Sequence, residues 1–187
     1  MIRITLVRHG KPAFELKGSV RAKDLGKIAK SYDLSGIVDT PPRETLAAAR
    51  GNHFVICSDL TRSIESAKAL GCPEVHATDP LFCESALPHF DGGSITLPIS
   101  VWIVVLRLMW VFGFSRNGES LGDLRKRARQ ASTRLIELAE QHHDVLLVGH
   151  GFVNHFIAKE LRRYGWLGPS KPAKGYWGYG SYERASA

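Results

Sequence analysis

The feature of this chain that most restricts its fold is a repeated order of segments. A short apolar run is followed by polar residues and then by a stretch of helical period, as after residues 2–7, 53–57 and 144–148. Short apolar runs bounded by turn residues are typical of strands that are buried on both faces. Strands that alternate with helices predict an α/β three-layer sandwich, in which a mainly parallel sheet is flanked by helices.

The helices are expected between and after these strands. Their ends are marked by Pro41-Pro42, Gly51 and Gly71, since proline favours the first turn of a helix and glycine its end. A further short strand is expected at residues 75–76. The predicted helices cover residues 20–30, 43–50, 60–70, 119–141 and 152–162.

Length and charge limit the functional classes. A chain of 187 residues suits a single domain over residues 1–187. The net charge of +7 favours acidic ligands, and phosphorylated molecules fit as well as nucleic acid does. The densest basic cluster, residues 125–129, has no interleaved aromatic side chains and lies in an amphipathic helical pattern. We therefore expect a solvated helix face there and no nucleic-acid partner.

The cysteines and the N-terminal residues indicate the compartment. Cys57, Cys72 and Cys83 have neither the even count of a disulfide scaffold nor the spacing of a zinc site. Arg3 and Arg8 interrupt any apolar core of a signal peptide near the start. The expected location is the cytoplasm.

Polar residues follow three of the predicted strands: Arg8-His9-Gly10, residues 57–62, and Gly149-His150-Gly151. In a parallel sheet, ligands bind beyond the carboxyl ends of the strands, so one crevice would collect all three. An arginine beside a histidine is unfavourable in a core unless an anion is bound there. Two histidines with Arg8 and Arg62 favour a tetrahedral phosphate. Gly10 is predicted to let the backbone approach that anion.

Together with Glu84 after Leu81-Phe82 and with residues 118–121, these motifs resemble the histidine phosphatase superfamily, which is phosphoglycerate-mutase-like. The resemblance implies a cofactor-independent hydrolase without a metal, acting on a small phosphomonoester or a phosphorylated protein. It implies His9 as the nucleophile that forms a phosphohistidine and Glu84 as the general acid, with Glu119 as the alternative. Residues implied to hold the phosphate are Arg8, Arg62 and His150, and further site candidates are Gly10, Lys11 and Gly151.

Lys11-Pro12 departs from the pattern, because many mutases of the superfamily carry an acidic residue or glutamine there. This disfavours a mutase, although a mutase-type phosphotransferase and an inactive phosphate-binding or membrane-associated scaffold remain alternatives. Lys11 either extends the positive field or is simply solvated. Asp59 is expected to cap the helix that follows it. Histidines that match no position of the pattern are expected to have surface or core roles; they are His53, His76, His89, His142, His143 and His155.

Residues 97–114 are nearly all apolar, with Arg107 as the only charge. The segment is shorter than the about 20 residues of a membrane span, so a helical insertion beside the pocket is predicted. A helix that is apolar all round needs burial on every side, which predicts a homodimer contact or a membrane-surface contact. The tail at residues 165–182 is expected to be either an edge strand or a packed segment.

Overall fold

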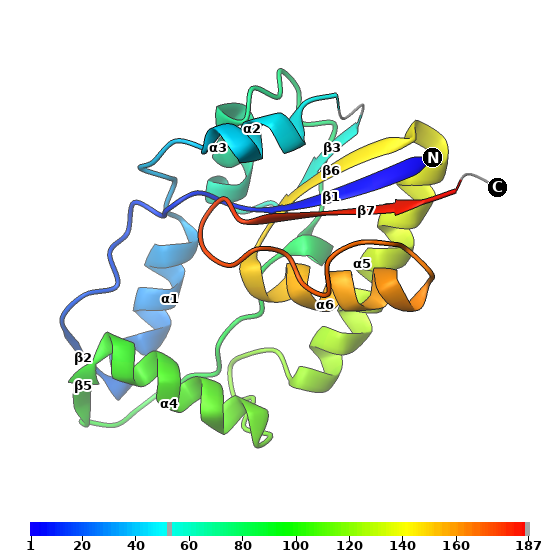
Figure 1. Ribbon diagram of the computed structural model, residues 1–187. Helices are drawn as coiled ribbons and strands as arrows, with labels where there is room; N and C mark the ends of the chain where they lie inside the picture. The colour runs from blue at the N-terminus through cyan, green and yellow to red at the C-terminus, as the bar shows by residue number, and fades with distance from the viewer. Residues whose placement is uncertain (52–53, 186–187) are drawn as a thin grey trace.

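The computed structural model describes residues 1–51 and 54–185. In this part of the chain the central sheet has five strands in the order β4-β3-β6-β1-β7 (Figure 1). Four of them are parallel, and β7 runs antiparallel to β1 at one edge. The strands are β1 (Ile2–Arg8), β3 (Phe54–Cys57), β4 (Ala77–Thr78), β6 (Asp144–Gly149) and β7 (Tyr179–Arg184).

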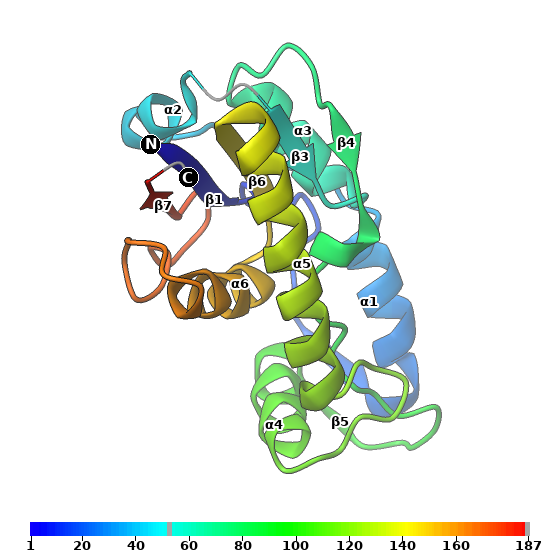
Figure 2. The ribbon, with the colours of Figure 1, turned by 90° about the vertical axis from the view of Figure 1, so that its right-hand side faces the viewer.

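Helices cover both faces of this sheet (Figure 2). On one face lie α2 (Arg43–Ala49) and α3 (Thr61–Ala69), and on the other lie α5 (Leu121–His142) and α6 (Gly151–Arg163). Side chains of β1 alternate between the two cores, because successive residues of a strand point to opposite faces. The predicted three-layer sandwich with a mainly parallel sheet is confirmed.

Two predicted elements are placed differently. The predicted helix at 20–30 begins later, because β2 (Ser19–Arg21) pairs with β5 (Thr96–Pro98), and α1 (Leu25–Asp33) follows after a 3-10 turn at Ala22–Asp24. The short strand predicted at 75–76 lies at Ala77–Thr78. It is displaced because the backbone N–H of His76 donates to the Val55 carbonyl and the ring of His76 accepts from the Val55 N–H. The predicted strand start at His53 lies outside the described residues.

The apolar insertion forms α4 (Ile99–Val111), at the end of the molecule where α1 and the β2–β5 pair lie (Figure 1). Its inner side, with Trp102 and Leu106, packs against Ala22 and Leu25. Its outer side is exposed, so intramolecular contacts cover only part of the helix, and a second copy or a membrane surface as its partner stays a prediction. No helix in the described part of the chain is long and apolar enough to cross a membrane. The exposed apolar side chains are Val101, Val104, Leu108, Val111 and Phe112.

The C-terminal tail combines both expected alternatives. Residues 179–184 form the edge strand β7, while Trp177 is buried before it. A Cβ on Gly10 would lie 2.4 Å from Cζ2 of Trp177 and 2.6 Å from Oδ1 of Asp39. Packing against these side chains therefore favours glycine at position 10, and the expectation that Gly10 also lets the backbone approach an anion stays a prediction.

Candidate phosphate-binding site

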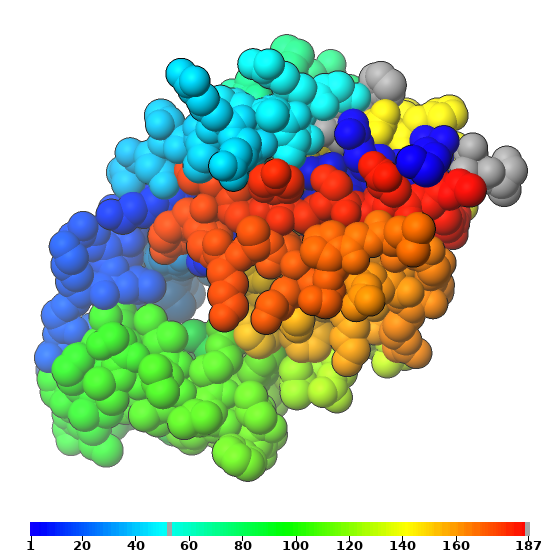
Figure 3. Space-filling view, in the orientation of Figure 1, coloured from blue at the N-terminus to red at the C-terminus, as the bar shows by residue number. Residues whose placement is uncertain are grey.

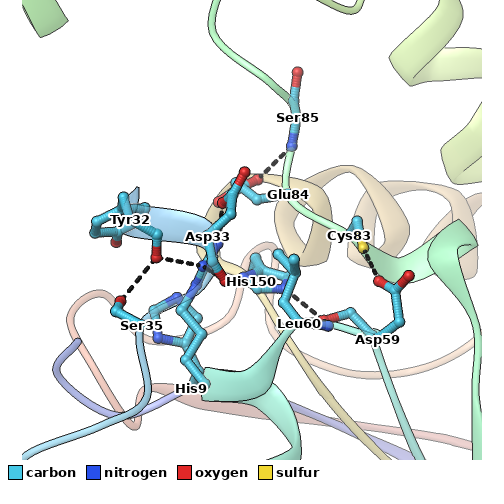
Figure 4. Close-up of polar contacts among 12 residues, drawn as sticks. His9, Tyr32, Asp33, Ser35, Asp59, Leu60, Cys83, Glu84, Ser85 and His150 are labelled. Carbon is cyan, nitrogen blue, oxygen red and sulfur yellow. Dashed lines mark hydrogen bonds and ion pairs between the residues drawn. The ribbon is translucent and has the colours of Figure 1, made fainter. Parts of the chain in front are cut away.

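The three polar strand ends meet at the carboxyl edge of the sheet (Figure 4). His9 follows β1, His150 follows β6, and Arg62 lies in the first turn of α3 after β3. The rings of His9 and His150 have centroids 4.9 Å apart. All three side chains are buried, since their residues are only 2%, 0% and 1% exposed. A buried arginine and two buried imidazoles thus lie together at the carboxyl edge of the sheet.

His9 is held in one tautomer. Its Nδ1 lies 2.7 Å from the carbonyl oxygen of Gly10, and because a carbonyl only accepts, Nδ1 carries the proton. Burial lowers the pKa of His9 to about 3, and Arg62 and Arg8 act in the same direction, while the Gly10 contact opposes them. His9 is therefore a neutral imidazole whose Nε2 lone pair is free at ordinary pH.

His150 is also neutral. Burial, followed by the neighbouring His9 and the arginines, lowers its pKa well below the usual value. Its Nε2 lies 2.7 Å from Oγ of Ser58, and that hydroxyl oxygen accepts the N–H of Leu60. A Ser58 hydroxyl that donates to Nε2 would place the proton of His150 on Nδ1. Nδ1 is buried and has no partner among the described residues.

The two arginines are oriented by their neighbours. Arg62 donates through Nη1 to the carbonyl of Tyr32 at 3.1 Å and through Nη2 to Oδ1 of Asp33 at 3.2 Å, which ties it to the end of α1. The guanidinium of Arg8 lies 4.5 Å from the centre of the Tyr176 ring. In both side chains Nε is buried and lacks a partner in the described part of the chain.

Three buried nitrogens are thus left without a hydrogen-bond partner: Nε of Arg8, Nε of Arg62 and Nδ1 of His150. Each such group costs free energy unless it is paired, and the arginine charges add to that cost. A tetrahedral oxyanion next to His9 would supply acceptors for donors from three different strand ends. Gly151 adds room, because a Cβ there would lie 3.1 Å from Nε of Arg8.

The two candidate acids lie in different surroundings. Oε2 of Glu84 accepts the N–H of Phe152 at 3.0 Å, and Oε1 accepts those of Val153 and Ser85, each at 3.1 Å. These bonds fix Glu84 at the start of α6, beside His150 (Figure 4). Glu119 instead forms a two-pronged ion pair with Arg127 at 2.6 and 2.7 Å. Glu84 faces the cavity that Arg8 also lines, and Glu119 does not line it.

Arg127 corrects the expectation of a wholly solvated basic helix face. Besides Glu119, its Nη1 donates to the carbonyls of Leu81 and Cys83 at 2.8 Å, and so it holds the segment that carries Glu84. Only the neighbouring residues of the cluster, such as Arg125 and Arg129, are exposed.

Two further expectations change. Asp59 does not cap α3, whose N-cap position is occupied by Leu60 and which has no side-chain cap. Its Oδ1 accepts the thiol of Cys83 at 2.7 Å instead, and burial together with this carboxylate raises the pKa of Cys83 to about 12. Lys11 is exposed and lies outside the cavity lining, with its backbone N–H donating to Asp39.

A sequence profile of the histidine phosphatase superfamily (branch 1) matches residues 43–171. The chain belongs to this superfamily. Its fold is also that of solved structures. A mycobacterial glucosyl-3-phosphoglycerate phosphatase in complex with VO3 is 21% identical with a TM-score of 0.62, over 97% of this chain and 92% of that one. An Entamoeba histolytica phosphoserine phosphatase variant in complex with phosphoserine is 17% identical with a TM-score of 0.60, over 97% and 90%. No curated protein matches the chain.

A cavity of about 540 Å³ opens beside the buried histidines of this superfamily member, between α4 and residues 171–178 (Figure 3). Arg8 and Glu84 line it, whereas His9, Arg62 and His150 lie behind its wall. Sequence reasoning missed the residues that wall it on the side away from the strand ends. The sequence could have indicated Arg107, because it is the one charged residue in an apolar helix, whereas the tail carries no motif. Within the described residues, no cluster of three or more histidine, cysteine or acidic side chains could hold a metal ion. The missed lining residues include Arg107, His155, Lys171 and Lys174.

Proposed function

We propose that the chain is a phosphatase that hydrolyses phosphomonoesters through a phosphohistidine on His9. One observation carries this proposal. A neutral, buried imidazole, with its proton fixed on Nδ1 by the Gly10 carbonyl, lies beside unpartnered N–H groups of Arg8, Arg62 and His150. A free lone pair next to an anion site is what attack on phosphorus requires.

In the first step Nε2 of His9 bonds to phosphorus as the bond from phosphorus to the alcohol oxygen breaks. Glu84 in its acid form donates a proton to the departing oxygen. Arg8, Arg62 and His150 donate to the three remaining oxygens and neutralise their charge. Such fixed donors suit phosphoryl transfer, whose catalysis depends mainly on positioning and electrostatic stabilisation.

In the second step a water molecule attacks phosphorus, and the carboxylate of Glu84 takes a proton from it. The N–P bond breaks, so that inorganic phosphate leaves and the His9 lone pair is restored. Support for Glu84 as the catalytic carboxylate comes from its place in the same cavity as Arg8. The three backbone N–H groups position it there and favour its carboxylate form, which is the form that the second step uses. The same group serves as acid and then as base.

The cavity volume of about 540 Å³ is typical of pockets for small molecules, which favours a small phosphomonoester over a phosphorylated protein. Each step of this scheme uses a side chain of the chain itself, and we propose that the reaction runs without a metal or another cofactor.

The test is to trap the intermediate. Brief incubation with a ³²P-labelled phosphomonoester, followed by quenching, is expected to leave an acid-labile, alkali-stable label that peptide mapping places on His9. His9→Ala is expected to lose both label and turnover.

The matched control is His143→Asn, which removes a histidine at the C-terminal end of α5. His143 is exposed, so asparagine, which is smaller and polar, replaces it without filling or emptying any core space. The control is expected to keep label and turnover. Full turnover by His9→Ala would refute the proposal.

A further inference from the structure

The charged groups around the cavity are unevenly distributed. Among its lining residues are four cations, Arg8, Arg107, Lys171 and Lys174, and a single carboxylate, Glu84. Arg8 belongs to the phosphate site at the end of β1. The other three cations come from α4 and the C-terminal tail, and none of them is needed to hold the transferred phosphoryl group.

Arg107 is the most constrained of these three cations. Its guanidinium lies 4.3 Å from the centre of the Phe152 ring and 5.1 Å from that of Trp110. Its Nη1 is buried and has no hydrogen-bond partner within residues 1–51 and 54–185. Arginine does not lose its charge in proteins, so this position carries a half-buried cation with an unused donor. Burial lowers the pKa of Arg107, and Glu84 partly offsets this effect.

Glu84 does not neutralise Arg107 by a direct ion pair. Both of its oxygens are engaged by backbone N–H groups of Ser85, Phe152 and Val153. The wall nearby is positive as well, since burial first and then Lys171 and Lys159 lower the pKa of His155, another lining residue. An anionic group on the ligand would both accept from the Arg107 guanidinium and offset its charge.

We infer that Arg107, assisted by Lys171 and Lys174, forms a second anion-binding subsite that selects phosphomonoesters whose alcohol portion carries a carboxylate or a second phosphate. This inference rests on the proposed function for the first subsite and adds the substrate class. The cavity is large enough for both groups of such a ligand, and aromatic side chains flank Arg107 on the side of α6.

The experiment uses matched substrates. The substrates are linear phosphomonoesters of three and five carbons, and the end opposite the ester carries a hydroxymethyl group, a carboxylate or a second phosphate. We expect the intact chain to show a kcat/KM about tenfold or more higher for charged ends than for hydroxymethyl ends, since charge-assisted hydrogen bonds are the stronger ones. The better of the two charged ends identifies the anion.

Arg107→Gln is expected to lower kcat/KM about tenfold or more for the charged ends and to leave hydroxymethyl esters within about twofold. Arg129→Gln is the matched control, because it removes the same charge from an exposed position on α5. It is expected to leave kcat/KM unchanged for both the charged-end and the hydroxymethyl esters. Equal kcat/KM for all ends in the intact chain, or an equal loss for all ends in Arg107→Gln, would overturn the inference.

A variant that misfolds would lose hydroxymethyl substrates too. Lys171→Gln with Lys174→Gln changes only exposed side chains, and about a threefold loss of the preference for charged ends is expected. An unchanged preference in this double variant, when Arg107→Gln does not fold, would also overturn the inference.

Calorimetric binding separates this subsite from the proposed reaction. In a His9→Ala background, charged-end esters are expected to bind at least about tenfold more tightly than hydroxymethyl esters, and Arg107→Gln is expected to remove that difference. Preferential binding without any turnover by the intact chain would refute the phosphatase and leave the subsite standing. Turnover without preferential binding would refute the second subsite and leave the phosphatase proposal standing.

Discussion

Two regions of the candidate site differ in how they are built. The phosphate cradle consists of Arg8, His9, Arg62 and His150, and the distal wall consists of Arg107, Lys171 and Lys174. Cradle side chains follow strand ends or begin a helix, and three of the four are almost fully buried. In the distal wall, the lysines lie on an irregular tail and are exposed. Fixed donors suit the unvarying phosphoryl group, whereas exposed cations on a tail suit discrimination among alcohols.

The two regions should therefore respond differently to mutation. A change in the cradle should slow every substrate by a similar factor, because each substrate presents the same phosphoryl group. A change in the distal wall should alter the ratio between substrates. The predictions below test whether this division holds.

The largest effect is expected for Arg62→Gln. It removes a buried charge from the cradle and should lower kcat/KM by about a hundredfold or more, equally for hydroxymethyl and carboxylate esters. Steady-state kinetics on both esters provides the measurement.

Arg62 also ties α3 to α1, so a control must separate that anchoring from phosphate binding. Asp33→Asn weakens the anchor and leaves Arg62 in place. Because Asp33 is half-exposed, its ion pair is worth little and less than a tenfold loss is expected. If both variants were equally impaired, anchoring of α1 rather than phosphate binding would be the role of Arg62.

Glu84→Gln should show the next largest effect and a dependence on the leaving group. We expect kcat to fall about a hundredfold for alkyl phosphates, which need a proton on the departing oxygen. Aryl phosphates such as p-nitrophenyl phosphate, with a good leaving group, should be affected far less in the phosphorylation step.

Glu119→Gln is the matched carboxylate control. It breaks the ion pair with Arg127, so the variant is expected to be less stable. Its ratio of alkyl to aryl rates should nevertheless equal that of the intact chain. A leaving-group dependence in Glu119→Gln, and none in Glu84→Gln, would exchange the two assignments.

The pH dependence of stability is a third test of the cradle. The pKa of His9 is about 3 in the folded chain against 6.5 unfolded, so the unfolded chain binds more protons between these values. The contribution of His9 to the free energy of unfolding should therefore be fully present above pH 6.5 and should be lost as the pH falls towards 3. The lowered pKa of His150 acts in the same direction.

His9→Gln removes one of these two titrations. The slope of unfolding free energy against pH should become less steep by up to about 1.4 kcal/mol per pH unit. Denaturant unfolding at several pH values between 4 and 7 gives this slope. Parallel curves for the variant and the intact chain would contradict a buried neutral His9.

The contrast between the regions also explains what the sequence could predict. The sequence predicted Arg8, His9 and His150 as site residues because each lies at the end of an apolar run, and the topology of a parallel sheet brings such ends together. The sequence could not predict Lys171 and Lys174 as site residues, because their position depends on β7, which folds back antiparallel onto β1 and carries the tail over the cavity. The role of Gly10 likewise depends on Trp177, a residue of that tail.

The smallest expected effect lies where the two regions meet, at Tyr176. Its ring packs under the Arg8 guanidinium at 4.5 Å and lies 5.9 Å from the His9 ring. An exposed cation–π contact is worth about 0.5–1 kcal/mol, so Tyr176→Leu should lower kcat/KM by roughly two- to fivefold.

Tyr176→Phe keeps the ring face and should retain the activity of the intact chain. If Tyr176 acts through Arg8, the loss in Tyr176→Leu will be the same for hydroxymethyl and carboxylate esters, although the residue belongs to the tail by sequence. A loss confined to carboxylate esters would instead place Tyr176 with the distal wall. The boundary between the regions would then follow the course of the chain rather than the contacts of the phosphate.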